Sequence, residues 1–212
     1  MILLVDKPKG ITSFDVIRKL RKELNIRKMG HAGTLDPLAS GLLIIATETD
    51  TKKLDQFLKL PKTYEVAVRI GEKRSTGDLE GEILEKVEVS DIGEEKAEEV
   101  LDGFVKVHTL TVPMYSAIKV DGKPLYWYAR NGVEVKAPQK DMEVTDVKLL
   151  NIEKSEGFVT INLELAVTSG TYIRALAEKF GELLGYPATT AELRRTVIGE
   201  YKVEDAKKIA AE

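Results

Sequence analysis

The stretch from Gly30 to Gly41, Gly-His-Ala-Gly-Thr-Leu-Asp-Pro-Leu-Ala-Ser-Gly, most constrains how this chain folds. Three glycines and a proline within twelve residues are incompatible with an ordinary helix or a central strand. The apolar run 42–46 follows directly and predicts a buried strand. A rigid loop that enters a buried strand is well suited to hold a side chain against a ligand.

Asp36 carries the only carboxylate of this loop, and Pro37 disfavours helical backbone geometry at Asp36. We predict that Asp36 is the catalytic residue. The alternative is that Asp36 only shapes a turn, because Asp-Pro is a common turn pair and aspartate often caps its own backbone. Local composition alone favours the turn. The agreement of the loop with distant segments, described below, favours catalysis.

Length and composition restrict the class of protein. A chain of 212 residues with 43 % hydrophobic and 32 % charged residues predicts one substantial globular domain. No apolar run approaches the roughly 20 residues of a membrane span, and the first residues do not resemble a secretory leader, so we expect a cytoplasmic protein. The chain has no cysteine and two histidines, which disfavours disulfides, thiol nucleophiles and a zinc site.

Charge is distributed unevenly along the chain. Residues 1–35 contain eight basic and three acidic residues, whereas residues 78–102 contain two basic and eleven acidic residues. A basic face close to the Asp36 loop would orient a polyanion toward it. The alternative is that both runs are ordinary solvated helix faces.

Periodicity and turn signals predict the order of the elements. Thr12 and Asp15 are spaced for a capping box at the start of a helix that ends near Asn25. Strict alternation of apolar residues predicts strands, and Gly185 is placed to end the helix that follows residues 168–174. The expected strands are 2–5, 42–47, 62–71, 82–89, 142–151, 159–167 and 199–206, and the expected helices are 12–25, 51–59, 94–101, 174–184 and a short piece at 191–195.

The segment 112–139 differs in composition from the rest of the chain. It contains three prolines and four aromatic residues interleaved with lysines and an arginine. Aromatic rings among cations are suited to stacking on unpaired bases and to phosphate contacts. The alternative is that the rings form a small satellite core. The aromatic residues are Tyr115, Tyr126, Trp127 and Tyr128.

Six segments together resemble the TruB family of tRNA pseudouridine synthases. They are Asp6–Gly10, the loop 30–41, Lys62-Thr-Tyr64, Met114–Ala117, Gly170-Thr-Tyr-Ile-Arg174 and Leu193-Arg-Arg195, in the order of the family. The resemblance implies isomerisation of uridine 55 in the T loop of tRNA to pseudouridine. It also implies the α+β pseudouridine synthase fold, with a long mixed, mostly antiparallel sheet, flanking helices and a central active-site cleft.

The resemblance implies one catalytic domain over residues 1–212, with an RNA-gripping insertion at about 112–140. Most relatives continue into a C-terminal RNA-binding domain of the PUA type. Because the sequence stops at Glu212, we expect no PUA domain here. The expected partner is the T stem-loop of tRNA, and a monomer without membrane contact is expected.

The resemblance also assigns roles to individual residues. Asp36 matches the essential aspartate, Tyr64 the tyrosine that stacks on the target uracil, and Arg174 the arginine that pairs with the aspartate. Tyr172 and Leu193 match residues of the pocket around the flipped nucleotide.

Three further positions follow from the same resemblance. His31 matches a histidine that helps hold the remodelled T loop, and Lys7 lies in the matching lysine-proline turn beneath the active site. Asp78 resembles part of a polar loop that borders the cleft.

The reaction class agrees with the residues present. The isomerisation needs no redox equivalent and no ATP, and the chain has no Rossmann or P-loop glycine pattern, so we expect no cofactor and no metal. The residues leave open whether Asp36 attacks C1′ or removes the 2′ proton. Two alternative functions are an RNA-guided pseudouridylase subunit and a tRNA-binding or tRNA-folding chaperone without catalysis.

Overall fold

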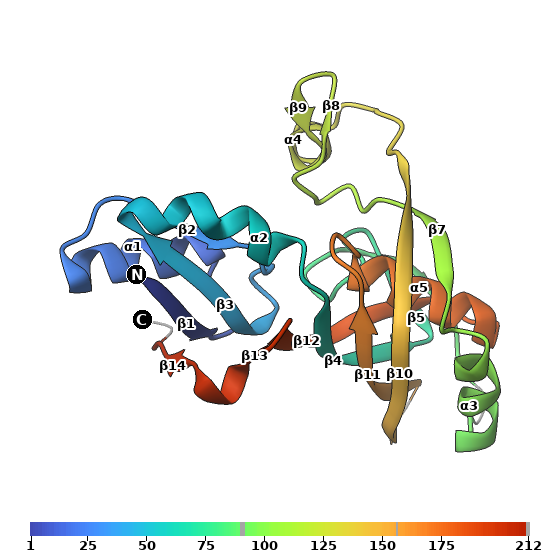
Figure 1. Cartoon of the computed structure of the whole chain (residues 1–212). Coiled ribbons are helices and arrows are strands. Elements are labelled where there is room, and N and C mark those ends of the chain that lie inside the picture. Colours follow the sequence, from blue (N-terminus) through green and yellow to red (C-terminus); the bar gives the residue numbers. More distant parts are fainter. Residues whose placement is uncertain (90–91, 156, 211–212) are drawn as a thin grey trace. The chain divides into compact units, whose positions relative to one another are not determined.

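The computed structural model describes residues 1–89, 92–155 and 157–210. The chain forms two compact units (Figure 1). Unit 1 comprises residues 1–65, 164–170 and 192–212, and unit 2 comprises residues 66–163 and 171–191. One catalytic domain over residues 1–212 stays a prediction.

The strands of unit 1 form a mixed, mostly antiparallel sheet. Its order is β14-β1-β3-β12, with β2 added to β3 and β13 added to β12. Strand β3 is antiparallel to β1 and β2 and parallel to β12. The bounds are β1 Ile2–Lys7, β2 Met29–Ala32, β3 Ser40–Thr47, β12 Ala188–Ile198, β13 Tyr201–Lys202 and β14 Lys207–Lys208.

Helix α1 (Ser13–Leu24) begins with the predicted capping box between Thr12 and Asp15. Val16, Ile17 and Leu20 of α1 pack in one core cluster with Leu43 and Ile45 of β3. Residues of β3 that point to the opposite face form a second core cluster with Phe57 of α2 (Leu54–Leu58), which follows the 3-10 helix η1 (Glu48–Lys53). Both faces of β3 are therefore covered, which explains its uninterrupted apolar run.

Unit 2 is built on strands in the order β4-β11-β10-β7. The bounds are β4 Lys62–Ile70, β7 Val107–Thr111, β10 Gln139–Ser155 and β11 Phe158–Val167. Residues 139–143 of β10 pair antiparallel with β7. Helix α5 (Ile173–Leu184) buries Leu176 and Phe180 and ends at Gly185 in the left-handed conformation.

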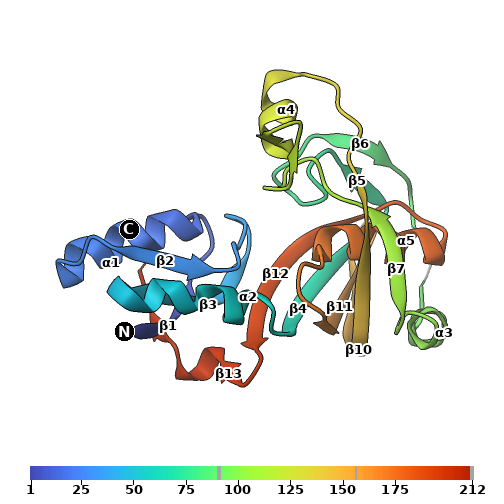
Figure 2. The same ribbon diagram turned by 45° about the horizontal axis from the view of Figure 1, so that its top comes forward.

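Smaller elements complete both units. Figures 1 and 2 show β8, β9 and α4 standing off one end of β10. Helix α3 (Glu94–Asp102) confirms the helix predicted at 94–101, whereas the following strand β7 was not predicted. The remaining bounds are β5 Glu72–Arg74, β6 Ile83–Lys86, β8 Lys119–Val120, β9 Lys123–Pro124, α4 Leu125–Asn131 and η2 Val203–Asp205.

The expected helical piece at residues 191–195 is wrong, because these residues lie inside β12. Alanine, leucine, glutamate and arginine are good helix formers, but pairing of β12 with β3 overrides this local preference. Three other expectations need adjustment. The first residues of the loop 30–41 belong to β2, and the expected strand 82–89 is reduced to the exposed β6. The expected strand 199–206 is reduced to β13, which is followed by η2.

Helices long and apolar enough to cross a membrane are absent from the part of the chain that the structure describes.

Candidate active site

The backbone around Asp36 in unit 1 is fixed on both sides. The Ser13 hydroxyl donates to the Leu35 carbonyl at 3.1 Å and accepts from the Leu35 N–H at 2.9 Å. The Gly10 N–H donates to the Pro37 carbonyl at 2.8 Å, and the Ala39 N–H donates to the Asp36 carbonyl at 3.1 Å. Asp36 therefore lies in a loop held by the turn after β1 and by the start of α1.

Replacing Ser13 by alanine removes both bonds to Leu35. Ser13 is 1 % exposed, so the Leu35 N–H and carbonyl would lose a buried partner. We expect Ser13→Ala to lower the free energy of unfolding by about 2 kcal/mol in urea titrations. Thr51→Ala is the control, since its hydroxyl bond to the Glu48 carbonyl is solvent-exposed and its loss should cost at most about 0.5 kcal/mol. Equal effects of the two changes would contradict this account.

Arg195 of β12 ties together the two ends of the loop. Its side chain is 1 % exposed, and its Nε donates to the Leu42 carbonyl at 2.8 Å. Its Nη2 donates to the Gly33 carbonyl at 3.0 Å. Gly41 pairs with Arg195 in the sheet at φ +106°, and a Cβ there would lie 2.2 Å from the Arg195 carbonyl oxygen. Glycine is therefore required at position 41.

Lys7 and Arg194 stabilise the turn next to this loop. Lys7 is fully buried, and its Nζ donates to the carbonyls of Pro8 at 2.9 Å and Ile11 at 2.7 Å. Arg194 forms a bidentate ion pair with the Asp6 carboxylate, with Nη1 3.0 Å from Oδ1 and Nη2 2.8 Å from Oδ2. Lys7 therefore holds the backbone of the lysine-proline turn after β1. A role of Lys7 toward the substrate stays a prediction.

His31, Tyr64 and Leu193 also belong to unit 1. Burial, and to a smaller extent the Arg195 charge, lower the pKa of His31, which favours a neutral imidazole near pH 7. Its Nδ1 is buried and has no hydrogen-bond partner among the described residues. Tyr64 and Leu193 are 7 % and 8 % exposed. Their contacts with a flipped base stay predictions.

Lys62, the first residue of the Lys-Thr-Tyr64 segment, is buried and donates to the carbonyls of Leu58 at 2.7 Å and Leu60 at 2.6 Å. Burial, with the Arg195 charge, lowers its pKa to about 8. In the unfolded chain Lys62 keeps its proton up to the ordinary lysine pKa of 10.5. Between these pH values the unfolded state binds more protons, so the free energy of unfolding rises with pH.

We therefore expect the free energy of unfolding of the wild type, relative to that of Lys62→Met, to increase as the pH rises from about 8 to 10.5. The gain is at most about 1.4 kcal/mol per pH unit. Urea titrations of both proteins at several pH values measure it. If the difference in free energy of unfolding between the two proteins does not change with pH, Lys62 has the same pKa in the folded and unfolded states.

Arg174 of α5 connects three segments of unit 2. It is 5 % exposed and donates through Nη1 to the Thr76 carbonyl at 2.6 Å and through Nη2 to the Tyr115 carbonyl at 2.8 Å. Its Nη1 lies 3.9 Å from Oδ2 of Asp78. Asp78 in turn accepts from the Thr76 hydroxyl at 2.5 Å and from the Glu80 N–H at 3.1 Å. Arg174 is thus a buried cation with a buried acidic neighbour.

Tyr172 is the residue before α5, and its carbonyl accepts from the Ala175 N–H at 3.1 Å. Tyr172 and Arg174 belong to unit 2, whereas Asp36 belongs to unit 1. The pairing of Arg174 with Asp36 therefore stays a prediction.

The aromatic residues of the insertion 112–140 divide into two kinds. Tyr128 is 8 % exposed and donates to the Val120 carbonyl at 2.9 Å, so it belongs to a local core. Tyr126 is 40 % exposed with Arg130 over its ring, and the half-buried Trp127 has the Lys123 Nζ 3.6 Å from its ring centroid. The satellite-core alternative applies to Tyr128, and contact of this segment with RNA stays a prediction.

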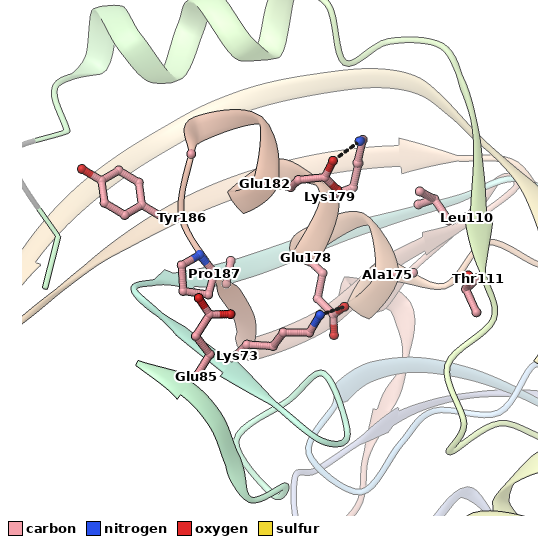
Figure 3. A pocket seen from close by; sticks show the side chains of 12 residues that line it. Lys73, Glu85, Leu110, Thr111, Ala175, Glu178, Lys179, Glu182, Tyr186 and Pro187 are labelled. Atoms are coloured by element: carbon pink, nitrogen blue, oxygen red, sulfur yellow. Dashed lines mark hydrogen bonds and ion pairs between the residues drawn. The ribbon is translucent and has the colours of Figure 1, made fainter. Parts of the chain in front are cut away.

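Figure 3 shows a pocket of about 530 Å³ in unit 2, bordered by α5 and by residues of β5, β6 and β7. The Nζ of Lys73 points to Glu178 at 4.0 Å, and Lys179 pairs with Glu182 at 2.7 Å. None of the described residues that line this pocket is a predicted site residue. No cluster of three or more metal-ligating side chains occurs in residues 1–89, 92–155 and 157–210.

The sequence analysis missed the roles of Ser13, Arg194 and Arg195. Ser13 received no functional role, because the capping box between Thr12 and Asp15 accounts for the start of α1. Arg194 and Arg195 belong to the segment 193–195 that resembles the TruB family, but the resemblance assigned a role only to Leu193. The sequence carries no signal for the burial of Arg195, because arginine is rarely buried and its partners lie far away along the chain.

Comparison with solved structures agrees with the α+β fold. The chain resembles a protein of an H/ACA RNP bound to a substrate RNA containing 2′-deoxyuridine, with 26 % identity and a TM-score of 0.71 over 98 % of the chain. A chain of a Cbf5-Nop10-Gar1 complex gives 27 % identity and a TM-score of 0.73 over 98 % of the chain. The chain spans 50 % and 52 % of the lengths of these two proteins.

A family model described as TruB family pseudouridylate synthase (N terminal domain) matches residues 21–173. The fold is therefore that of a pseudouridine synthase. Proteins called tRNA pseudouridine synthase B are 39 % identical in Fusobacterium nucleatum and 40 % in Desulfotalea psychrophila, covering 96 % and 97 % of this chain. The chain spans 69 % and 84 % of those proteins. The chain belongs to the TruB family.

Proposed function

We propose that the protein isomerises uridine 55 in the T loop of tRNA to pseudouridine. The observation that carries the proposal is the clamped Asp36 loop, in a chain 39 % and 40 % identical to proteins called tRNA pseudouridine synthase B. The reaction breaks the glycosidic C–N bond, turns the base over and rejoins it through C5. Once the new C1′–C5 bond has formed, the proton on C5 leaves and N1 takes up a proton, so that the product is an isomer of the substrate.

Asp36 would act as a carboxylate beside the ribose. It either attacks C1′ or removes the 2′ proton, and both routes place it next to an electron-poor sugar carbon, as in glycosidases. A carboxylate in a dry pocket needs a cation to stay ionised. The proposal requires Arg174 to supply that cation and to meet Asp36 in the RNA-bound enzyme.

The target nucleotide must leave the base stack, which costs roughly a few kcal/mol. We propose that Tyr64 offsets part of this cost by stacking on the extruded uracil, since base–aromatic stacking contributes about 1–3 kcal/mol. Tyr172 and Leu193 would shape the same pocket, His31 would contact the T loop as a neutral imidazole, and Lys7 would support the turn below. Asp78 would act only through Arg174.

Tritium release tests the proposal. A synthetic T-arm hairpin with C5-tritiated uridine at position 55 should release tritium with the wild-type chain, and a hairpin with the label at another uridine should not. Release without any guide RNA or partner protein would separate this function from that of an RNA-guided subunit. Absence of release under conditions in which the hairpin is bound would favour the chaperone.

The RNA-guided alternative has less support. Identity is 39 % and 40 % to proteins called tRNA pseudouridine synthase B but 26 % and 27 % to the chains of the RNP and Cbf5 structures. We further propose that the enzyme acts as a monomer on free tRNA in the cytoplasm.

A further inference from the structure

The outer face of helix α1 carries an exposed phenylalanine between two guanidinium groups. Phe14 is 52 % exposed, among the most exposed large apolar side chains of the described residues. The Cζ atoms of Arg18 and Arg21 lie 5.9 Å and 5.7 Å from the centroid of its ring. An aromatic ring in water costs hydrophobic free energy, so its position outside the core needs an explanation.

The helical spacing produces this cluster. Phe14, Arg18 and Arg21 stand at i, i+4 and i+7, which places them along one face of a helix. The core-facing residues of α1 lie on the other face. Arg21 is half-buried and its Nη2 donates to the Met29 carbonyl at 3.5 Å, whereas Phe14 and Arg18 are exposed. The exposed Phe14 ring is therefore a surface feature that packing of α1 does not require.

The cluster lies next to the Asp36 loop within unit 1. Ser13, the residue before Phe14, exchanges two hydrogen bonds with Leu35, the residue before Asp36. The rest of the helix surface adds positive charge through Lys22, and the 25–28 turn adds Arg27 and Lys28, all three of them exposed. This is the part of the chain in which basic residues outnumber acidic ones.

We propose that Phe14, Arg18 and Arg21 form a second RNA-binding surface, which holds the tRNA substrate beside the Asp36 loop. This proposal rests on the proposed function. Phe14 offers a face on which an unstacked base can lie, and the guanidinium groups contact adjacent phosphates. Charge complementarity favours a polyanion here, because basic residues outnumber acidic ones in residues 1–35, even though Arg18 forms an ion pair with Asp15.

The alternative is that the two arginines merely shield the Phe14 ring from water. Shielding predicts no effect of Phe14 on RNA affinity. If the surface binds RNA, an aromatic ring at position 14 is needed for full RNA affinity, and any aromatic ring suffices. The two arginines then contribute a salt-dependent part of that affinity.

The test measures binding of a T-arm hairpin to wild type and variants by fluorescence anisotropy at several salt concentrations. We expect Phe14→Ala to raise Kd at least about fivefold and Phe14→Tyr to keep the wild-type Kd. We expect Arg18→Gln to lower the slope of log Kd against log salt by about 1. Lys202→Gln, an exposed lysine on β13 of the same unit, is the matched control and should leave Kd within about twofold and the slope unchanged.

Turnover separates this inference from the proposed function. With saturating hairpin, Phe14→Ala should form pseudouridine at the wild-type kcat, because Phe14 lies outside the residues assigned to the chemistry. A Phe14→Ala protein with wild-type Tm and wild-type Kd would overturn the inference, as would an equal loss in Lys202→Gln. If Phe14→Ala lowers Tm, the slope change in Arg18→Gln decides. If wild type binds the hairpin but makes no product, the proposed function fails instead.

Discussion

Asp36→Asn should abolish pseudouridine formation while the protein still binds T-arm RNA. The amide keeps the shape of the side chain but cannot form the carboxylate that the sugar carbon requires. We expect a fall in turnover of about 10,000-fold or more, the size seen when an enzyme loses a group that reacts directly. Single-turnover tritium release with excess enzyme measures the chemical step apart from product release.

Binding controls define what this result means. The affinity of Asp36→Asn for the hairpin should stay within about threefold of wild type, since one neutralised carboxylate changes few phosphate contacts. Ser13→Ala is the companion variant, because it loosens the loop but keeps the carboxylate, and it should retain part of the turnover. Turnover by Asp36→Asn near the wild-type rate would remove Asp36 from the mechanism.

Gly41→Ala should destabilise the protein more than the other changes considered. The new Cβ would lie 2.2 Å from the Arg195 carbonyl oxygen, 2.7 Å from its nitrogen and 2.9 Å from its carbonyl carbon. The neighbouring atoms are backbone atoms of a paired strand, so relief requires β3 and β12 to separate at this point. The positive φ adds strain for any residue with a Cβ. We expect a loss of about 3–5 kcal/mol in the free energy of unfolding.

Gly10→Ala is the matched control for this prediction. Gly10 also has a positive φ, of +86°, but nothing lies within 4 Å of its added Cβ. Gly10→Ala should therefore lower the free energy of unfolding only by the conformational cost of a positive φ, about 1–2 kcal/mol. Equal losses in the two variants would show that β3 and β12 adapt to the extra carbon without opening.

Much of the fold was accessible from local patterns. The capping box of α1, the alternation of β11 and the glycine stop of α5 are each coded within a few neighbouring residues. Residues 191–195 failed because their helix propensity is intrinsic, whereas their strand conformation comes from pairing with β3.

The candidate site was also predictable only in part, because local patterns can be read from the sequence and long-range contacts cannot. The composition of the loop 30–41 indicates rigidity, but it does not reveal what holds the loop rigid. Ser13 reaches Leu35 across 22 residues, and Arg195 reaches Gly33 across 162 residues. Contacts of this kind depend on the folded backbone and leave no periodic pattern in the sequence. The resemblance to the TruB family located the candidate residues, and their mutual arrangement across the two units stays a prediction.

The two anchors of Arg195 have a consequence for synthesis on the ribosome. The loop that holds Asp36 leaves the exit tunnel early, but the guanidinium that closes it is translated 162 residues after Gly33. Closing so long a connection is slow compared with local helix formation. The nascent chain should therefore complete this loop only after Arg195 has left the exit tunnel, so that RNA-modifying activity cannot begin before β12 is made.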